Sequence, residues 1–454
     1  MTDRIDNSEY SQDQPGAPKI NVPVLSDGEF VKVARELITK LDSEKHCFLT
    51  EQQLAKALEN PNIKAKEAQA LAAMYENFDK LQNLVPPLSI WDPKGISYDD
   101  LASFGRMEKE HSKRLNDATA LKSWAPNNMI FFDKDGDGSL ALNEIDTAIK
   151  NGSTPQQDKE MLRKVKDNYS EIAPWFSDTN PQAIATFAEG VESDTSAARL
   201  VSAIKSTSQN VSDGQSPQIC HDLYSDRENP LASINPDAIR QGSLQDCYFL
   251  AALAAVAKSN PQKIMDAIQD NGNGTYTVSF PGAQEKITVK APTQAEQGIY
   301  NHASPNGTWA SVMEKAFGEY YRRQSLAGAN TPAEGAGGGG RPGYSLEFLT
   351  GNPVDRDIVG WSFQSSIATK LEDAFKNNKA VTAGITSSNW SSHTADDFFR
   401  GHAYSITGFV AGPDGSGMVT IRNPWGGEKG STQGTISISL EKFMSNFSEI
   451  HFEQ

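Results

Sequence analysis

The first part of the chain carries a helical pattern of apolar and polar positions. Over residues 25–191, apolar side chains recur three and four positions apart, for example at Phe30, Ala34 and Leu37. Short breaks rich in Asp, Gly, Pro and Ser separate these runs. The pattern predicts an all-α domain over residues 25–191. The polar, proline-containing residues 1–24 before it are expected to be disordered.

After this domain the pattern changes twice. Residues 192–228 are rich in Ser, Asn and Gln, and predict a linker with one helical turn. A continuous apolar helix follows, then mixed helix and strand, a glycine run at 335–340 and alternating strands up to the C-terminus. No Lys-Ser or Lys-Thr follows the glycine run, so we interpret it as a flexible connection rather than a phosphate loop. The mixed part is expected to divide into a helical half, 229–334, and a β-rich half, 335–454.

Composition narrows the class of protein. The 454 residues are 37% hydrophobic and 22% charged, and contain no apolar run long enough to cross a bilayer. A net charge of −16 argues against a nucleic-acid binder, which needs a basic face. Three cysteines are too few for a disulfide framework. The polar N-terminal residues do not resemble a signal peptide, so we expect a cytoplasmic protein, with export by another route left open.

Residues 133–144, DKDGDGSLALNE, fit the twelve-residue calcium loop of an EF-hand. The candidate ligands are four carboxylates and one backbone carbonyl: Asp133, Asp135, Asp137, Glu144 and the carbonyl of Ser139. The acids stand at the first, third, fifth and twelfth positions, from which their oxygens can converge on one ion. Gly138 stands at the sixth position, where the chain must turn sharply. The segment therefore predicts a Ca²⁺ site.

EF-hand loops normally occur in pairs, so related loops are expected nearby. The candidate relatives, with the residue at their eighth position, are 42–53 (Leu49), 89–100 (Ile96) and, more weakly, 177–188 (Ile184). The first of these lacks the sixth-position glycine and ends in Gln53, which cannot bind calcium with two oxygens. We interpret the region as four helix-loop-helix units, of which only one retains its metal. A generic helical bundle with one calcium loop is the alternative.

The continuous apolar helix of the second half begins at Cys247, in QGSLQDCYFLAALAAVA. Asp246 is a favourable N-cap residue, which places Cys247 in the first helical turn. Unpaired N–H groups and the positive end of the helix dipole favour a thiolate there, the form that attacks carbonyl carbons. Most free cysteines are small core residues, so this cysteine alone does not establish catalysis.

A predicted hairpin offers a base and an orienting group for that thiol. His402 opens the alternating segment GHAYSITGF, and after the turn GPDGSG a second strand ends at Asn423. The hairpin would bring both residues to one edge, where the Asn423 carbonyl can hold the imidazole. Trp425 would cover that hydrogen bond from water. His393 is a rival base, but it lies in a loop-like stretch with no orienting partner.

Three motifs around these residues resemble the calpain family of cysteine proteases. QGSLQDCY at 241–248, GHAYS at 401–405 and IRNPWG at 421–426 agree with the family's motifs in order and spacing. The similarity extends over about half of the chain, and implies a papain-like core of two subdomains. Two departures lie next to the cysteine, where Gln245 replaces a usual glycine and Tyr248 the more common tryptophan.

The resemblance implies a role for each matching residue. Cys247 would be the nucleophile, His402 the general base and then acid, and Asn423 the group that orients the imidazole. Gln241 would donate its amide N–H to the developing oxyanion, beside the backbone N–H of Cys247.

Calpain cores also bind regulatory calcium, which the resemblance implies for this chain. Glu314 aligns with one such ligand, whereas Asp237 falls one residue out of the usual register. Whether calcium acts through the core, through the loop at 133–144 or through both stays open. So does the possibility that the helical domain is an inhibitory prosegment.

We therefore expect an α+β protein, with a two-subdomain, papain-like protease core of the calpain type preceded by an all-α EF-hand-like domain. Its expected activity is calcium-regulated, limited cleavage of protein or peptide substrates through a thiolate acyl-enzyme. A calcium-sensing scaffold with an inactive protease fold is one alternative. A transglutaminase is another, although that class favours aspartate at the position of Asn423. Neither nucleic acid nor a transmembrane segment is expected, and the oligomeric state is not predicted.

Overall fold

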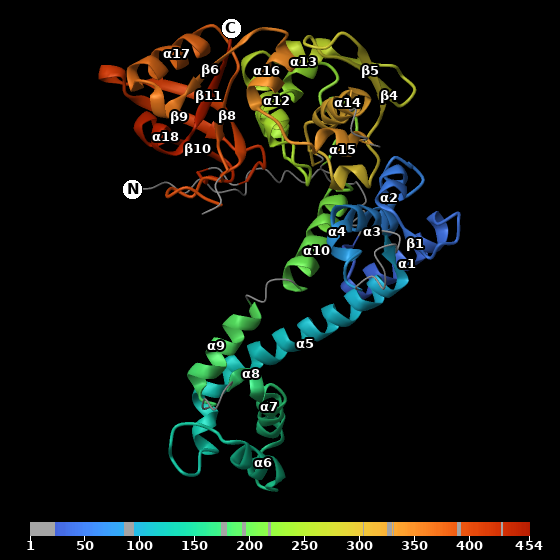
Figure 1. Cartoon of the computed structure of the whole chain (residues 1–454), viewed down its shortest axis with the longest axis vertical. Helices are drawn as coiled ribbons and strands as arrows, with labels where there is room; N and C mark the ends of the chain where they lie inside the picture. The colour runs from blue at the N-terminus through green and yellow to red at the C-terminus, as the bar shows by residue number, and fades with distance from the viewer. Residues whose placement is uncertain are drawn as a thin grey trace. The chain divides into compact units, whose positions relative to one another are not determined.

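The computed structural model describes residues 23–85, 95–173, 179–192, 197–216, 219–302, 304–324, 329, 331–387, 392–427 and 430–454. These residues divide into two compact units, and Figure 1 labels most of their helices and strands. The helical unit consists of Leu25–Leu49 and Asn77–Ser206, and the mixed unit of Met1–Val24, Thr50–Glu76 and Thr207–Gln454. The disorder expected for residues 1–24 concerns a segment that, apart from Pro23 and Val24, lies outside the described residues.

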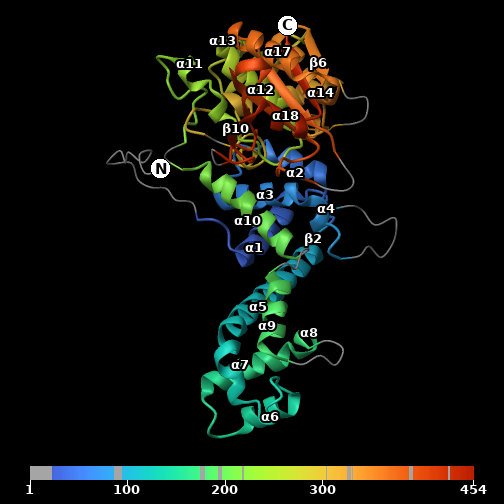
Figure 2. The same ribbon diagram turned by 90° about the vertical axis from the view of Figure 1, so that its left-hand side faces the viewer.

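The helical unit is built from helices, as the apolar spacing over residues 25–191 predicts. They are α1 (Asp27–Leu41), α4 (Phe78–Leu81), α5 (Tyr98–Asn128), α6 (Leu142–Lys150), α7 (Gln156–Asp167), α8 (Tyr169–Ile172) and α9 (Pro181–Glu192), with a 3₁₀ turn η2 (Met129–Phe131). Part of its core is a fully buried cluster that includes Leu121, Ile145, Leu162 and Ile184, from four different helices. The view in Figure 2 shows α5 and α9 alongside each other, and the two helices are in contact.

Two short strands in the helical unit form an antiparallel pair, β1 (Phe48–Leu49) and β2 (Ile96–Ser97). Leu49 lies opposite Ile96, and both side chains are fully buried. These are the residues that the sequence places at the eighth position of the loops 42–53 and 89–100.

Leu140, the eighth residue of the loop 133–144, also pairs with a distant segment. Its N–H donates to the carbonyl of Thr179 over 2.8 Å. Ile184, the residue that the sequence places at the eighth position of 177–188, lies inside α9 instead. The register expected for that weaker relative is therefore wrong, because the residue opposite Leu140 lies five positions earlier.

The first half of the mixed unit is mostly helical. Its helices are α2 (Glu51–Leu58), α3 (Ala65–Glu76), α11 (Pro230–Ser233), α12 (Cys247–Ser259), α13 (Pro261–Ala267), α14 (Trp309–Gln324), α15 (Pro332–Ala336) and α16 (Pro342–Thr350), with 3₁₀ turns η4 (Pro236–Ala238) and η5 (Glu296–Gly298). A three-stranded antiparallel sheet of β3 (Ile268–Asp270), β4 (Thr275–Ser279) and β5 (Lys286–Lys290) completes this half. Helix α12 is buried from Tyr248 to Ala257, because its residues are apolar on every face.

The second half of the mixed unit is a six-stranded antiparallel sheet in the order β10-β9-β8-β7-β11-β6. The strands are β6 (Val354–Ile358), β7 (Val381–Ile385), β8 (His402–Ala411), β9 (Gly417–Arg422), β10 (Thr435–Ser439) and β11 (Glu449–Glu453), with helices α17 (Gln364–Lys376) and α18 (Leu440–Asn446) and 3₁₀ turns η6 (Val359–Trp361) and η7 (Pro413–Gly415). Helix α12 packs against β7 and β8, which brings the two halves together. The mixture of helix and sheet agrees with the expected α+β class. Among helices in the described ranges, none is long and apolar enough to span a bilayer.

The segment expected to be a linker with one helical turn contains a full helix, α10 (Ala197–Asp213). Leu200, Ile204 and Val211 are buried at helical spacing within it. The many Ser, Thr, Asn and Gln residues obscured this stripe, since Thr207 and Ser208 are themselves buried. The boundary between the two units falls within this helix, at Ser206 and Thr207.

Helices α2 and α3 belong to the mixed unit, although the helical pattern alone had grouped them with residues 25–191. The Thr293 hydroxyl donates to the carbonyl of Leu58 over 2.6 Å, and the N–H of Ala65 donates to Gln294 over 2.8 Å. Periodicity identifies a helix but not the surface on which its apolar face packs.

Candidate active site

Cys247 is the first residue of α12, and Asp246 is the residue before the helix. The carbonyl of Asp246 accepts hydrogen bonds from the N–H groups of Phe249 and Leu250, at 2.8 and 3.1 Å. Its carboxylate makes no capping bond, which differs from the expectation for an aspartate at this position. The carboxyl group is fully buried and hydrogen-bonded to Glu314 instead.

The Cys247 thiol is protonated in this arrangement. Burial raises its pKa to about 11; a hydrogen bond from the backbone of Ala403 opposes the shift, and the charge of Asp246 reinforces it. Burial thus favours the thiol, in the opposite direction to the thiolate that the helix terminus favours.

His402 and Asn423 meet at one end of the β8–β9 hairpin. The strands pair antiparallel, with Ser405 opposite Arg422. Nε2 of His402 lies 2.9 Å from Oδ1 of Asn423. The same Oδ1 accepts from the N–H of Trp425 at 3.0 Å, while Nδ2 of Asn423 donates to the carbonyl of Thr432. The oxygen is thus an acceptor, so Nε2 carries the imidazole proton and Nδ1 is left with a lone pair.

The imidazole of His402 is enclosed by aromatic rings. The Trp425 ring lies 4.7 Å from it, between centroids, and the Tyr404 ring lies 4.9 Å away. Burial lowers the pKa of His402 to about 4, and the hydrogen bond to Asn423 opposes that shift. At neutral pH the imidazole is uncharged and able to accept a proton.

Contacts between the two halves place these residues around one cavity. The Ser405 hydroxyl donates to the carbonyl of Ala251 in α12 over 2.9 Å, and the N–H of Gln241 donates to the carbonyl of Pro424 over 2.8 Å. The cavity, of about 370 Å³, is lined by a set that includes all but one of the sequence-predicted catalytic residues: Cys247, His402, Gln241 and Trp425. Asn423 lies behind His402, fully buried. Within the described residues no hydrogen bond joins the thiol to the imidazole.

His393, the rival base, is not among the residues that line this cavity. Its Nδ1 lies 2.9 Å from the hydroxyl of Ser392, and its ring packs on Phe399 with centroids 4.3 Å apart. The structure therefore brings His402, and not His393, to the cysteine.

The glycine run at 335–340 packs against the site, whereas the sequence suggested a flexible connection. A Cβ on Gly340 would lie 2.5 Å from the ring of Tyr248, and the Tyr248 hydroxyl donates to the carbonyl of Ala336 over 3.2 Å. A Cβ on Gly335 would lie 2.1 Å from the carbonyl oxygen of Gly318 in α14. These glycines serve close backbone approach rather than flexibility.

The sequence did not reveal that two carboxyl groups are buried together beside the cysteine. Asp246 and Glu314 are both fully buried and hydrogen-bonded to each other. Burial raises the pKa of Asp246 to about 7 and that of Glu314 well above its usual range. Two signals were available: Glu314 interrupts an apolar stretch, and Asp246 directly precedes Cys247.

The same arrangement bears on calcium binding within the core. Glu314, which aligns with a family ligand, faces Asp246 and accepts a hydrogen bond from the N–H of Asn301. The Asp237 carboxylate is largely exposed, 3.8 Å from the guanidinium of Arg422. Among the described residues these groups form no cluster that could hold a metal.

The loop 133–144 has the donor set that a hard cation requires. Oxygens of Asp133, Asp135 and Asp137 lie within 4.8 Å of one another. A hydrogen bond from the Asp137 amide acts in the opposite direction, but slight burial and the neighbouring carboxylates raise the pKa of Asp135. Glu144 is turned to the loop backbone, accepting from the N–H of Lys134 at 2.7 Å and of Ala141 at 3.0 Å. Three of the four expected carboxylates therefore converge, and the fourth is held within the same loop.

The loop 42–53 repeats two of the bonds of loop 133–144. In each, the first aspartate accepts from the N–H of the sixth residue: Cys47 to Asp42 at 2.6 Å, and Gly138 to Asp133 at 2.8 Å. Both sixth residues have positive φ, 67° at Cys47 and 88° at Gly138. In each loop the twelfth side chain also accepts from the N–H of the ninth residue, as Gln53 does from Thr50 at 2.9 Å.

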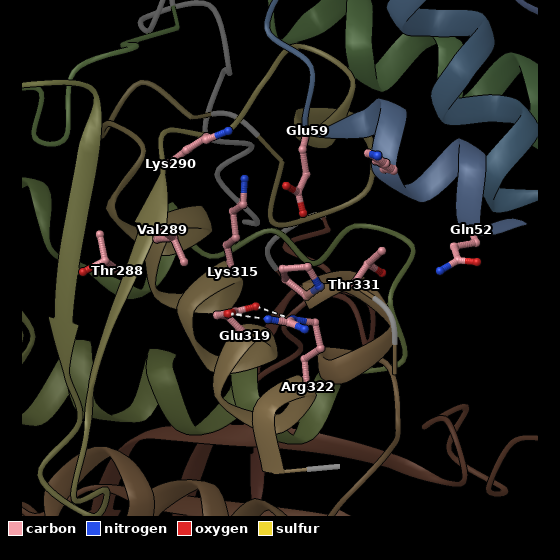
Figure 3. A pocket seen from close by; sticks show the side chains of 11 residues that line it. Gln52, Glu59, Thr288, Val289, Lys290, Lys315, Glu319, Arg322 and Thr331 are labelled. Carbon is pink, nitrogen blue, oxygen red and sulfur yellow. Dashed lines mark hydrogen bonds and ion pairs between the residues drawn. The ribbon is translucent and has the colours of Figure 1, made fainter. Parts of the chain in front are cut away.

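A second cavity, of about 390 Å³, is lined in part by helix α14 and is shown in Figure 3. Its cationic side chains on α14 already have acidic partners. Arg322 bonds to Glu319 at 2.6 and 2.8 Å, and Lys315 lies 2.7 Å from Glu296. We assign no ligand to this cavity.

Comparison with known proteins gives the family. The profile of the calpain family cysteine proteases matches residues 203–449. The chain is 26% identical over 213 residues to the calpain-type cysteine protease DEK1 of Zea mays, and 27% identical over 204 residues to calpain clp-1 of Caenorhabditis elegans. It is 28% identical over 213 residues to calpain-8 of Mus musculus.

These alignments cover 43%, 42% and 41% of this chain, but only 9%, 25% and 28% of the respective relatives. These alignments leave most of each relative's length unmatched. Residues 203–449, which match the family profile, contain the three motifs and the cavity around Cys247 and His402. The chain belongs to the calpain family of cysteine proteases.

Proposed function

We propose that this chain is a cysteine endopeptidase that hydrolyses peptide bonds in protein substrates. The observation that carries the proposal is the single cavity shared by Cys247, His402 and Gln241, with Asn423 2.9 Å behind the imidazole. Each group has the chemistry that one step requires: a thiol to attack, a neutral imidazole to accept its proton, and an amide to stabilise an oxyanion.

The proton movements follow from the protonation states. Because the pKa of Cys247 is about 11 and that of His402 about 4, the resting pair is neutral. Transfer of the thiol proton to Nδ1 of His402 accompanies attack of Sγ on the carbonyl carbon, which gives an acyl-enzyme after the amine leaves with that proton. Water then attacks the thioester with His402 again as the base. Asn423 keeps Nδ1 directed at these atoms by holding Nε2.

Peptide hydrolysis tests this proposal against its alternatives. Wild type at millimolar calcium should cleave an unstructured protein such as casein at internal bonds, and Cys247→Ala should lower that rate by at least about a thousandfold. Cys220→Ser, which changes a thiol outside the cavity, serves as the control and should retain activity. A folded wild type without hydrolysis would favour the inactive scaffold, and incorporation of an amine into casein would favour a transglutaminase.

We further propose that Ca²⁺ binds the loop 133–144 and regulates this activity. The converging oxygens of Asp133, Asp135 and Asp137 support binding, with Glu144 and the Ser139 carbonyl completing the set. The hydrogen bonds and positive φ that loop 42–53 shares with this loop support an EF-hand-like origin of the region. A bound ion would neutralise the mutual repulsion of the carboxylates.

A further inference from the structure

The side-chain amide of Gln241 has two hydrogen-bond acceptors beside the nucleophile. Its Nε2 donates to the carbonyl of Leu244 over 2.7 Å and to Oδ1 of Asp246 over 3.3 Å. The orientation of the amide is determined by these neighbours, since the reverse orientation would set Oε1 against two acceptors. Oε1 is buried and has no hydrogen-bond partner among the described residues. The amide plane therefore depends on what Nε2 contacts.

Asp246 is held in place from the other side by Glu314. Both carboxyl groups are fully buried, and a hydrogen bond joins them. Glu314 is itself anchored on α14, where it also accepts from the N–H of Asn301. A chain of hydrogen bonds thus runs from α14 through Asp246 to Gln241.

Capping of α12 does not explain why the carboxyl group of Asp246 is buried. Its backbone carbonyl starts α12, but its side chain makes no capping bond. Taking a carboxyl group out of water is costly unless its oxygens are bonded, and its bonds here go to Gln241 and Glu314. The Asp246 carboxyl group therefore points toward the side-chain amide of Gln241.

We propose that Asp246, held by Glu314, is a positioning residue that fixes the amide of Gln241 for oxyanion stabilisation. The carbonyl of Leu244 accepts from the Gln241 amide at 2.7 Å, whereas the bond to Asp246, at 3.3 Å, is longer and weaker. As the Sγ–C bond forms, the carbonyl π electrons move to oxygen and the thiol proton moves to His402. The second N–H of Gln241 is then shared between Asp246 and that oxygen, so the bond to Asp246 keeps the amide in place while the oxyanion forms.

This inference rests on the proposed peptidase activity, and a matched pair of variants tests it. Asp246→Asn keeps an acceptor for Gln241 and offers an amide N–H to Glu314. Asp246→Leu has a similar size but no polar atom. With a fluorogenic peptide at saturating calcium, Asp246→Leu should lower kcat about 10- to 100-fold with KM changed less than about threefold. Asp246→Asn should stay within about threefold of wild type in kcat.

A double-mutant cycle shows whether Asp246 acts through Gln241. Gln241→Ala alone should lower kcat about 100-fold, and adding Asp246→Leu should lower it no further. Alkylation of Cys247 by iodoacetamide forms no oxyanion, so Asp246→Leu should not slow it. Multiplicative losses in kcat, or an equal loss in alkylation, would make Asp246 a purely structural residue and overturn the inference.

The outcomes separate this inference from the proposed function. An inactive wild type would refute the peptidase activity itself, whereas an active wild type with an equally active Asp246→Leu would refute only the positioning role. If Asp246→Leu does not fold, Asp246→Ala takes its place in the same cycle, because it removes the carboxyl group and leaves only a small cavity.

Discussion

At the scale of residues, Cys247 and His402 have pKa values shifted in opposite directions in one cavity. The pKa of the thiol is raised to about 11 and that of the imidazole is lowered to about 4, in each case mainly by burial. The motifs identified both residues, and also Asn423 and Gln241. They did not reveal the protonation states, because these depend on how much of each side chain the folded chain removes from water.

The first prediction concerns the pH dependence of thiol reactivity. In a Cys47→Ser/Cys220→Ser background, iodoacetamide should alkylate Cys247 slowly at neutral pH. Because only the thiolate reacts and its pKa is about 11, the rate should rise about tenfold per pH unit from pH 6 to 9. Mass spectrometry of the labelled peptide measures this rate, and the same background with Cys247→Ala gives the blank. A rate already constant above pH 6 would indicate a preformed thiolate–imidazolium pair.

At the scale of elements, periodicity identified the helices and alternation identified the closing strands. These patterns failed where polar residues or glycines are packed in the interior. The polar composition of Ala197–Asp213 obscured α10, whose Leu200 and Ile204 are buried. The glycine run was interpreted as flexible, although Gly335 of α15 contacts the backbone of α14 at Gly318. Local composition does not show which backbone lies opposite a glycine.

The second prediction compares two glycines of that run. Gly335→Ala would place a Cβ 2.1 Å from the Gly318 carbonyl oxygen, and should destabilise the mixed unit by about 1–3 kcal/mol. Gly338→Ala is the matched control, because a Cβ there has no atom within 4 Å. Urea unfolding should show a lower midpoint for Gly335→Ala only. Equal midpoints for the two variants would mean that α14 and α15 tolerate separation.

At the scale of the whole molecule, the chain combines a calpain-type mixed unit with a helical unit that carries the acidic loop. The family match extends over residues 203–449, and so excludes the loop 133–144. Calcium control through this loop would therefore be a property of the helical unit rather than of the shared core.

The third prediction separates calcium binding from calcium regulation. Calorimetric titration should show Ca²⁺ binding to wild type, weakened at least about tenfold by Glu144→Gln, which removes a bidentate ligand. Asp146→Asn is the control, since Asp146 lies outside the loop and pairs with Lys166. If the loop regulates the enzyme, EGTA should lower casein cleavage by wild type, and Glu144→Gln in calcium should match wild type in EGTA. Unchanged cleavage in both conditions would leave the loop a binding site without control.

The sequence by itself determined the family, the α+β class, the candidate catalytic residues in the three motifs, and the acidic loop 133–144. These features are local, because a motif or a loop needs only the right residue types at the right spacing. The tertiary structure decided the rest: which unit α2 and α3 join, why Gly335 and Gly340 must be glycines, and that His402 rather than His393 faces the cysteine. It also brought Asp246 and Glu314, which are far apart along the chain, into contact in the interior. Burial and long-range contact are properties of the packed molecule, and no single segment encodes them.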